Sequence, residues 1–306
     1  MISETAVRTI KGYTKEENVH LQEPMSQHTT FRVGGPADCL IEICDKEELR
    51  KICKFLGMTG IPFFVMGNGS NLLVSDQGYR GVILKIQSGM NEVRVEGTRL
   101  IAQAGATMAQ AARVAMEHGL TGLEFASGIP GTVGGGVVMN AGAYDGDMSQ
   151  VVKNVEVLSP EGEFWNLDNE TMEFGYRTSS IKGQAYVVTE VEFALAEGDP
   201  AQIKAVTDGL AVKRREKQPL EFPSAGSTFK RPEGHFAGKL IMDAGLRGFS
   251  VGGAQVSEKH CGFVINTQPG TTTAGDVMTL IRHVQNIVKD KFDVTLEPEV
   301  IFLGEF

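Results

Sequence analysis

Two glycine-rich segments constrain this chain more than any other feature of its sequence. Residues 66–74 read MGNGSNLLV, and residues 126–136 read ASGIPGTVGGG. Glycine tolerates positive φ and lets a ligand approach the main chain closely. Successive N–H groups in such turns form a concave site for an anion without any cationic side chain. Each segment follows an apolar run, so together they predict the two halves of a clamp on one pyrophosphate.

Length and charge exclude several classes of protein. With 306 residues, 42% of them hydrophobic, the chain can form one or two cores and two or three subdomains. A net charge of −9 disfavours nucleic acid as a general partner. No apolar stretch is long enough for a membrane helix, and the first residues, MISET, do not resemble a signal peptide. We therefore expect a cytoplasmic protein with no membrane contact and no obligate protein partner.

The cysteines do not indicate a metal centre. The chain has four, none of them in C-x-x-C spacing: Cys39, Cys44, Cys53 and Cys261. Zinc sites need clustered ligands, so no metal is expected. Free, buried thiols in a reducing compartment are the better interpretation.

Alternating strand and helix patterns predict an α/β (α+β) fold. After a short helix and a polar segment in residues 1–30, apolar runs predict strands at 40–43, 63–66, 81–86, 92–95, 99–102, 155–158, 186–191 and 296–303. Periodic patterns predict helices at 46–56, 108–118, 201–215 and 276–291. Thr107 is the expected N-cap of the second helix, and Gly119 follows its end.

The segment 196–200, AEGDP, is the best candidate for a linker. It predicts an N-terminal segment at 1–29, a first domain at 30–198 and a second domain at 199–306. The first domain would have subdomains at about 30–88 and 89–198.

Neither of the common nucleotide-binding signatures fits. Residues 67–72 lack the third glycine of a Rossmann motif, where Leu72 stands instead. Residues 234–239 are one residue short of a Walker loop, and Leu240 replaces its Ser or Thr. The phosphate is therefore expected to be bound in another way.

Six sequence blocks in a fixed order carry a family resemblance. They are GNGSNLL at 67–73, GIPGTVGG at 128–135, MNAGAY at 139–144, YRTS at 176–179, AGSTF at 225–229 and EPEV at 297–300. From about His28 to Glu299 the chain resembles the UDP-N-acetylenolpyruvoylglucosamine reductases, which are FAD enzymes of cell-wall precursor synthesis. The connection between Arg177 and Tyr186 is short, as in the shorter type of family member, which lacks a tyrosine-bearing insertion. Which residue closes over the substrate is therefore an open question at this point.

The resemblance implies an FAD-binding domain in two parts, of the vanillyl-alcohol-oxidase/PCMH type, followed by a C-terminal α/β substrate domain. Neither glycine loop contains a His or Cys for covalent attachment, so FAD is expected to bind non-covalently. NADPH is the implied reductant. The implied cofactor-binding residues are Gly67, Asn68, Gly69, Ser70, Asn71, Gly128, Ile129, Pro130, Thr132, Gly134, Gly135, Ala141 and Gly142.

The same resemblance implies three catalytic residues. Arg177 faces the enolpyruvyl carboxylate in the family, and a guanidinium can bind a carboxylate and stabilise an enolate. No His or Asp lies near Ser227 in sequence to make it a nucleophile of triad type. The resemblance implies instead that Ser227 is the proton donor to the substrate carbon. Glu299 is favoured as the catalytic acid, while Glu297 remains possible. The strand 296–303 is apolar on both faces near its end, so we expect burial there and a paired or protonated carboxylate.

Cationic residues near position 215 have two interpretations. Residues 213–217 read KRREK at a helix end, where cations complement the helix dipole. The resemblance points to Lys217 as a ligand of the diphosphate of a UDP-sugar. Arg231 and His260 occupy positions that contact substrate in relatives.

The implied reaction is NADPH-dependent, FAD-mediated reduction of UDP-N-acetylglucosamine enolpyruvate to UDP-N-acetylmuramate. Hydride goes to the enolpyruvyl methylene carbon and a proton from Ser227 goes to the neighbouring carbon. Two alternatives stay open at this point. One is an FAD-linked oxidase of an alcohol or sugar on the same fold, and the other is a flavin-binding protein without turnover.

Overall fold

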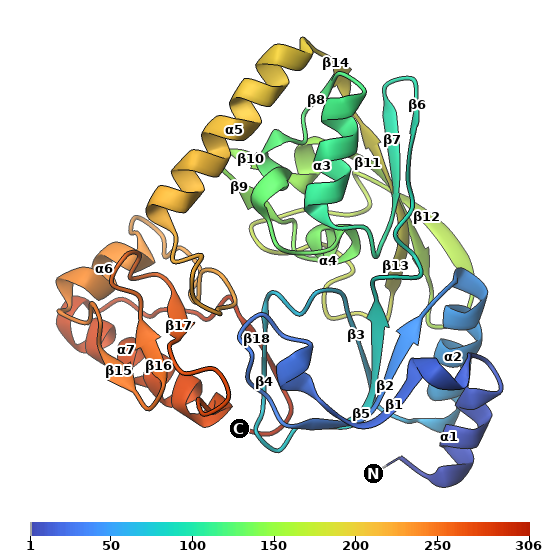
Figure 1. Cartoon of the computed structure of the whole chain (residues 1–306), viewed down its shortest axis with the longest axis horizontal. Helices are drawn as coiled ribbons and strands as arrows, with labels where there is room; N and C mark the ends of the chain where they lie inside the picture. The colour runs from blue at the N-terminus through green and yellow to red at the C-terminus, as the bar shows by residue number, and fades with distance from the viewer. Residues whose placement is uncertain (1) are drawn as a thin grey trace. The chain divides into compact units, whose positions relative to one another are not determined.

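The computed structural model describes residues 2–306 and shows a mixed α/β chain (Figure 1). It divides into two compact units. The first contains the residues up to His20, Cys39–Gly67 and Gly81–Arg214. The second contains Leu21–Asp38, Asn68–Arg80 and Arg215–Phe306. In the part of the chain that is described, no helix is both long and apolar enough to cross a membrane.

A four-stranded sheet, most of whose residues belong to the first unit, has the strand order β1-β2-β5-β3. The bounds of its strands are β1 Val19–Pro24, β2 Pro36–Ile43, β5 Tyr79–Ile86 and β3 Phe63–Met66. Helices α1 (Glu4–Lys11) and α2 (Lys46–Thr59) belong to the same unit. Asp45 caps α2 by accepting from Glu48 N at 2.8 Å, and Gly60 ends it in the left-handed conformation.

A five-stranded antiparallel sheet forms the rest of the first unit, with the order β12-β11-β13-β7-β6. Its strands are β6 Val93–Glu96, β7 Arg99–Gln103, β11 Val152–Leu158, β12 Phe164–Asp168 and β13 Val187–Ala194. Helices α3 (Met108–Glu117) and α4 (Val133–Val138) pack against this sheet (Figure 1). The predicted caps of α3 are confirmed, because Thr107 Oγ1 accepts from Gln110 N at 3.0 Å and Gly119 has φ +67°.

The second unit is built around helix α7 (Ala274–Phe292), which packs on a three-stranded sheet (Figure 1). That sheet contains β15 Ser250–Val251, β16 Ala254–Val256 and β17 Val264–Asn266. Helix α6 (Ala237–Asp243) lies beside α7. Strand β18 (Ile301–Leu303) pairs in parallel with β4 (Leu72–Val74), which directly follows the first glycine loop.

The remaining elements are short, apart from helix α5. Helix α5 runs over Pro200–Lys217. The short strands are β8 Leu120–Thr121, β9 Gly142–Ala143, β10 Gly146–Asp147 and β14 Ala196–Glu197, and the 3-10 turns are Glu16–Asn18, Met25–Gln27, Glu124–Gly128 and Met148–Gln150.

Most predicted elements are confirmed, and the differences have physical reasons. The predicted linker contains β14, because Ala196 and Glu197 pair with β8. The closing strand is limited to β18, and the expected burial on both of its faces is wrong, since Phe302 is 36% exposed. The two compact units are divided differently from the expected domains at 30–198 and 199–306, which stay a prediction. Strands β1 and β12 and helices α4 and α6 were not predicted, since glycine and charged residues interrupt their patterns.

The thiols largely agree with expectation. None of the four cysteines, all of them within the described residues, forms a disulfide. Cys39, Cys53 and Cys261 are buried, whereas Cys44 is half-buried. Burial raises the pKa of Cys53 to about 12, so this thiol stays protonated and unreactive.

Candidate functional site

The two glycine loops meet at the N-terminus of α4 within the first unit. A Cβ placed on Gly67 would lie 2.2 Å from Thr132 Oγ1, so no larger residue fits there without a shift. Thr132 is the N-cap of α4, and its hydroxyl accepts from Gly135 N at 3.4 Å. Glycine at position 67 therefore allows the first loop to begin directly against the second.

The remaining residues of the first loop belong to the second unit. Gly69 has φ +60°, which changes the direction in which the following amides point. Its carbonyl accepts from Thr30 N at 3.2 Å. Among the described residues, the main-chain N–H groups of Gly69, Ser70 and Asn71 have no protein acceptor. These donors fit the phosphate oxygens of a dinucleotide.

The second loop uses many of its own amides within the protein. Val133 N donates to Ala106 O at 2.8 Å, and Gly134 N donates to Ala104 O at 2.9 Å. A Cβ on Gly134 would lie 2.9 Å from the Cβ of Ala104. Close packing of α4 on the sheet is thus one reason for glycine at 134. Its role toward the cofactor stays a prediction.

Arg214 on α5 is a candidate functional residue that the sequence did not single out from its run of charges. A Cβ on Gly128 would lie 2.8 Å from Arg214 Nη1, so the guanidinium lies against the start of the second loop. Burial lowers the pKa of Arg214, whereas its neighbours Lys213 and Lys217 are exposed. Among the described residues it forms no ion pair with a carboxylate, so its charge is suited to an anionic ligand.

Arg177 occupies a strained turn in the first unit. The turn is closed by hydrogen bonds between Gly175 and Thr178, and Arg177 has φ +57°. A non-glycine residue in this conformation costs about 1–3 kcal/mol and often marks a functional site. Its guanidinium donates to Gly142 O at 3.3 Å.

Asn140 connects the same turn to the block at 139–144. This residue is buried, has φ +42°, and donates from Nδ2 to Gly175 O at 3.0 Å. The structure therefore brings the predicted catalytic Arg177 together with Gly142, a predicted cofactor residue.

Ser227 and Glu299 come from neighbouring antiparallel segments of the second unit. Glu299 N donates to Thr228 O at 2.8 Å, and Lys230 N donates to Glu297 O at 2.8 Å. The side chain of Glu297 is exposed and paired with Lys230 Nζ at 2.9 Å, whereas Glu299 is half-buried. Glu297 therefore has a surface partner, and the choice between the two carboxylates stays a prediction.

The three predicted substrate residues also lie in the second unit. Lys217 is exposed at the end of α5, and Arg231 lies over the exposed ring of Phe236 at 4.0 Å. His260 accepts from Gly262 N through Nδ1 at 3.1 Å. Burial lowers the pKa of His260, so a neutral ring with its proton on Nε2 is available as a donor.

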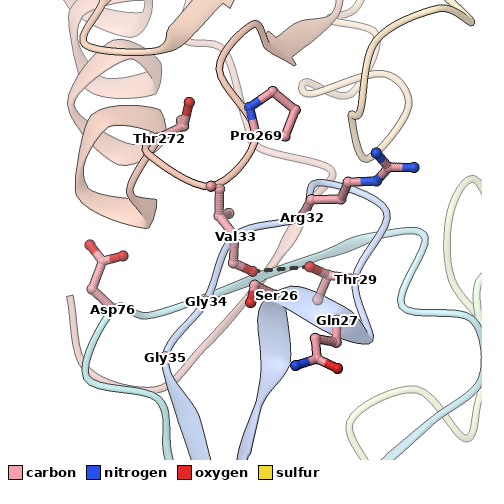
Figure 2. A pocket seen from close by; sticks show the side chains of 11 residues that line it. Ser26, Gln27, Thr29, Arg32, Val33, Gly34, Gly35, Asp76, Pro269 and Thr272 are labelled. Carbon is pink, nitrogen blue, oxygen red and sulfur yellow. Dashed lines mark hydrogen bonds between the residues drawn. The ribbon is translucent and has the colours of Figure 1, made fainter.

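A pocket of about 520 Å³ lies elsewhere in the second unit (Figure 2). It is lined by Ser26, Gln27, Thr29, Arg32, Val33, Gly34, Gly35, Asp76, Pro269, Gly270 and Thr272. The carboxylate of Asp76 accepts from Ala274 N and Gly275 N at the start of α7, and Arg32 points away from it. None of the predicted site residues lines this pocket, so its size does not identify it as the reaction site.

Comparison with known proteins identifies the class of protein first. An FAD-binding domain profile matches residues 37–168. Alkyldihydroxyacetonephosphate synthase shares the fold at a TM-score of 0.50 and 15% identity over 64% of this chain and 41% of that chain. The chain therefore belongs to the flavoproteins, with an FAD-binding domain of the predicted fold.

More similar relatives identify the family. Residues 218–303 match the C-terminal domain of UDP-N-acetylenolpyruvoylglucosamine reductase. The reductase of Caldanaerobacter subterraneus subsp. tengcongensis is 50% identical over 99% of this chain and 100% of its own length. The crystal structure of the Thermus caldophilus reductase has a TM-score of 0.80 and 34% identity, covering 94% of this chain and 98% of that one. The chain belongs to the UDP-N-acetylenolpyruvoylglucosamine reductase family.

Proposed function

We propose that Arg177, Ser227 and Glu299 carry out the reduction of UDP-N-acetylglucosamine enolpyruvate to UDP-N-acetylmuramate in this chain. Family membership over nearly the whole length supports this reaction above the oxidase and the non-catalytic alternatives. A bound FAD would supply the hydride chemistry that connects NADPH to the enolpyruvyl double bond. We expect the reaction to take place in the cytoplasm, without nucleic acid or a further protein partner.

The residues of the first unit bind and orient anionic groups. The guanidinium of Arg177 is a bidentate donor for the enolpyruvyl carboxylate and stabilises negative charge that develops on it. Gly67, Thr132 and Arg214 provide close approach and positive charge for the pyrophosphate of the cofactor. The strained turn at Arg177 is the observation in this unit that most favours a functional role.

The residues of the second unit complete the reduction. The hydroxyl of Ser227 donates the proton to the carbon next to the site of hydride addition. Glu299 lies on the adjacent segment, where its carboxyl group can stabilise the enolate when protonated. The main-chain pairing of these two segments is the single observation that carries the assignment, because it joins two distant sequence blocks. Lys217, Arg231 and His260 are assigned to the UDP-sugar.

The test separates the two halves of the reaction. In Ser227→Ala, we expect FAD binding and flavin reduction by NADPH to be retained. Reoxidation of the reduced flavin by the enolpyruvyl sugar should slow by about 10²- to 10⁴-fold, the usual contribution of a general acid. Stopped-flow absorbance follows both steps, and Ser250→Ala, at an exposed serine, is the matched control. Normal reoxidation in Ser227→Ala would remove Ser227 from the mechanism.

A further inference from the structure

Thr30 forms two hydrogen bonds that join distant parts of the second unit. Its main-chain N donates to Gly69 O, in the first glycine loop, at 3.2 Å. Its hydroxyl donates to Ser224 O at 2.6 Å, three residues before Ser227. One residue thus connects the first glycine loop to the segment that carries the proposed proton donor.

The turn before Ser227 needs such an anchor. Gly226 has φ +75°, and a Cβ placed on it would meet nothing within 4 Å. Gly226 itself therefore adds no side-chain packing to the turn, whereas Ala225 before it is buried in the core of this unit. The side chain of Ser227 is exposed, so its position depends on the segments before and after the turn. Before the turn, Ser224 forms a β-bridge with Ile265 and accepts from Thr30; after it comes Thr228.

The anchor after the turn is rigid. Thr228 is fully buried, its N donates to Gly262 O at 2.8 Å, and its hydroxyl accepts from Val264 N at 2.9 Å. Thr30 is itself held in place, since the adjacent Phe31 is fully buried in the core of this unit. The hydroxyl bond from Thr30 to Ser224 therefore completes the fixation of the turn on both sides.

Asn71 makes the corresponding connection to the catalytic acid. Its side-chain Nδ2 donates to Glu299 O at 3.1 Å, and its main-chain O accepts from Ile301 N at 2.9 Å. These bonds continue into the parallel pair of β4 and β18. The side chain of Asn71 is thus used to hold Glu299, while its main-chain N–H stays available to the cofactor.

We propose that Thr30 and Asn71 are positioning residues that hold Ser227 and Glu299, respectively, against the first glycine loop. The loop that binds the cofactor then serves as the common support of the proton donor and the acid. This inference rests on the proposed roles of Ser227 and Glu299. Its consequence is that loss of either bond slows the second half-reaction selectively, since small misplacements of reacting groups cost about 100-fold.

The first test is Thr30→Val, which removes the hydroxyl, keeps the main-chain bond to Gly69 and nearly preserves volume. With FAD bound, we expect flavin reduction by NADPH at the wild-type rate and reoxidation by the enolpyruvyl sugar slowed roughly 10- to 100-fold. Thr30→Ser should restore most of the rate. Thr29→Val is the matched control, because it removes a similar bond, from Thr29 Oγ1 to Val33 O, within a local turn (Figure 2).

Double variants distinguish positioning from general destabilisation. If Thr30 acts through Ser227, Thr30→Val should have no further effect on reoxidation in a Ser227→Ala background. Asn71→Ala should likewise have no further effect in Glu299→Gln. Additive losses, or equal slowing of both half-reactions, would overturn the inference. If Ser227→Ala alone reoxidised normally, the proposed function would fail instead, so the two failures are distinct.

Discussion

Among single residues, Arg214 is the cation whose surroundings most require an anion. It is half-buried against Gly128, and burial lowers its pKa, so its charge is costly without a ligand. The exposed cations around it on α5 do not have this cost.

Arg214→Met keeps much of the stem packing and removes the charge. A charge-assisted hydrogen bond contributes about 1.5–3 kcal/mol, so we expect FAD to bind roughly 10- to 100-fold more weakly to the apoprotein. FAD fluorescence quenching measures the affinity, and Lys213→Met is the control at an exposed neighbour. An unchanged FAD affinity together with a raised KM for the UDP-sugar would assign Arg214 to the substrate.

His260 gives a pH dependence whose sign follows from its burial. In the unfolded chain histidine titrates near pH 6.5, whereas burial lowers the pKa of His260 in the folded protein. As pH falls through about 6.5, the unfolded chain binds the proton first, so the free energy of unfolding decreases. His260→Gln removes this contribution. As pH falls from about 7.5 to about 5.5, the Tm of His260→Gln should therefore rise relative to the Tm of wild type. A Tm difference that stays constant over this range would contradict the assignment.

At the scale of elements, local signals predicted helices better than the packing that surrounds them. The caps of α2 and α3 are formed by Asp45 and Thr107, each within one turn of the helix it begins. Helix α4 was not predicted because five of the eleven residues at 126–136 around its start are glycine, which disfavours a helix. Its stability comes from packing on the sheet.

Helix α5 contains a glycine whose substitution should stabilise the protein. Gly209 is exposed within α5, and a Cβ placed on it would meet nothing within 4 Å. Gly209→Ala should raise the free energy of unfolding by about 1 kcal/mol, because alanine loses less backbone entropy in a helix. The control is Gly60→Ala, which is equally open but has φ +65°, and it should destabilise instead. Urea denaturation measures both, and a destabilised Gly209→Ala would show that α5 needs flexibility there.

At the scale of the whole molecule, stability should depend on FAD. A ligand that binds only the folded state adds about 2.7 kcal/mol at a concentration 100 times its Kd. Removal of FAD should therefore lower Tm, and added FAD should restore it in a concentration-dependent way. Riboflavin, which lacks the pyrophosphate, should restore much less if the glycine loops hold the phosphates. An equal shift with riboflavin would argue against the loops as the phosphate site.

The sequence by itself determined the class of fold, most helices and strands, and the six blocks that identify the family. These signals are local, because caps, turns and glycine loops depend on neighbouring residues. Only the tertiary structure decided that Arg214 lies on the second loop, that Glu297 is paired with Lys230, and that Thr30 and Asn71 hold the segments of Ser227 and Glu299. Burial and hydrogen-bond partners depend on segments that are far apart in the chain, and no local pattern records which of them will meet.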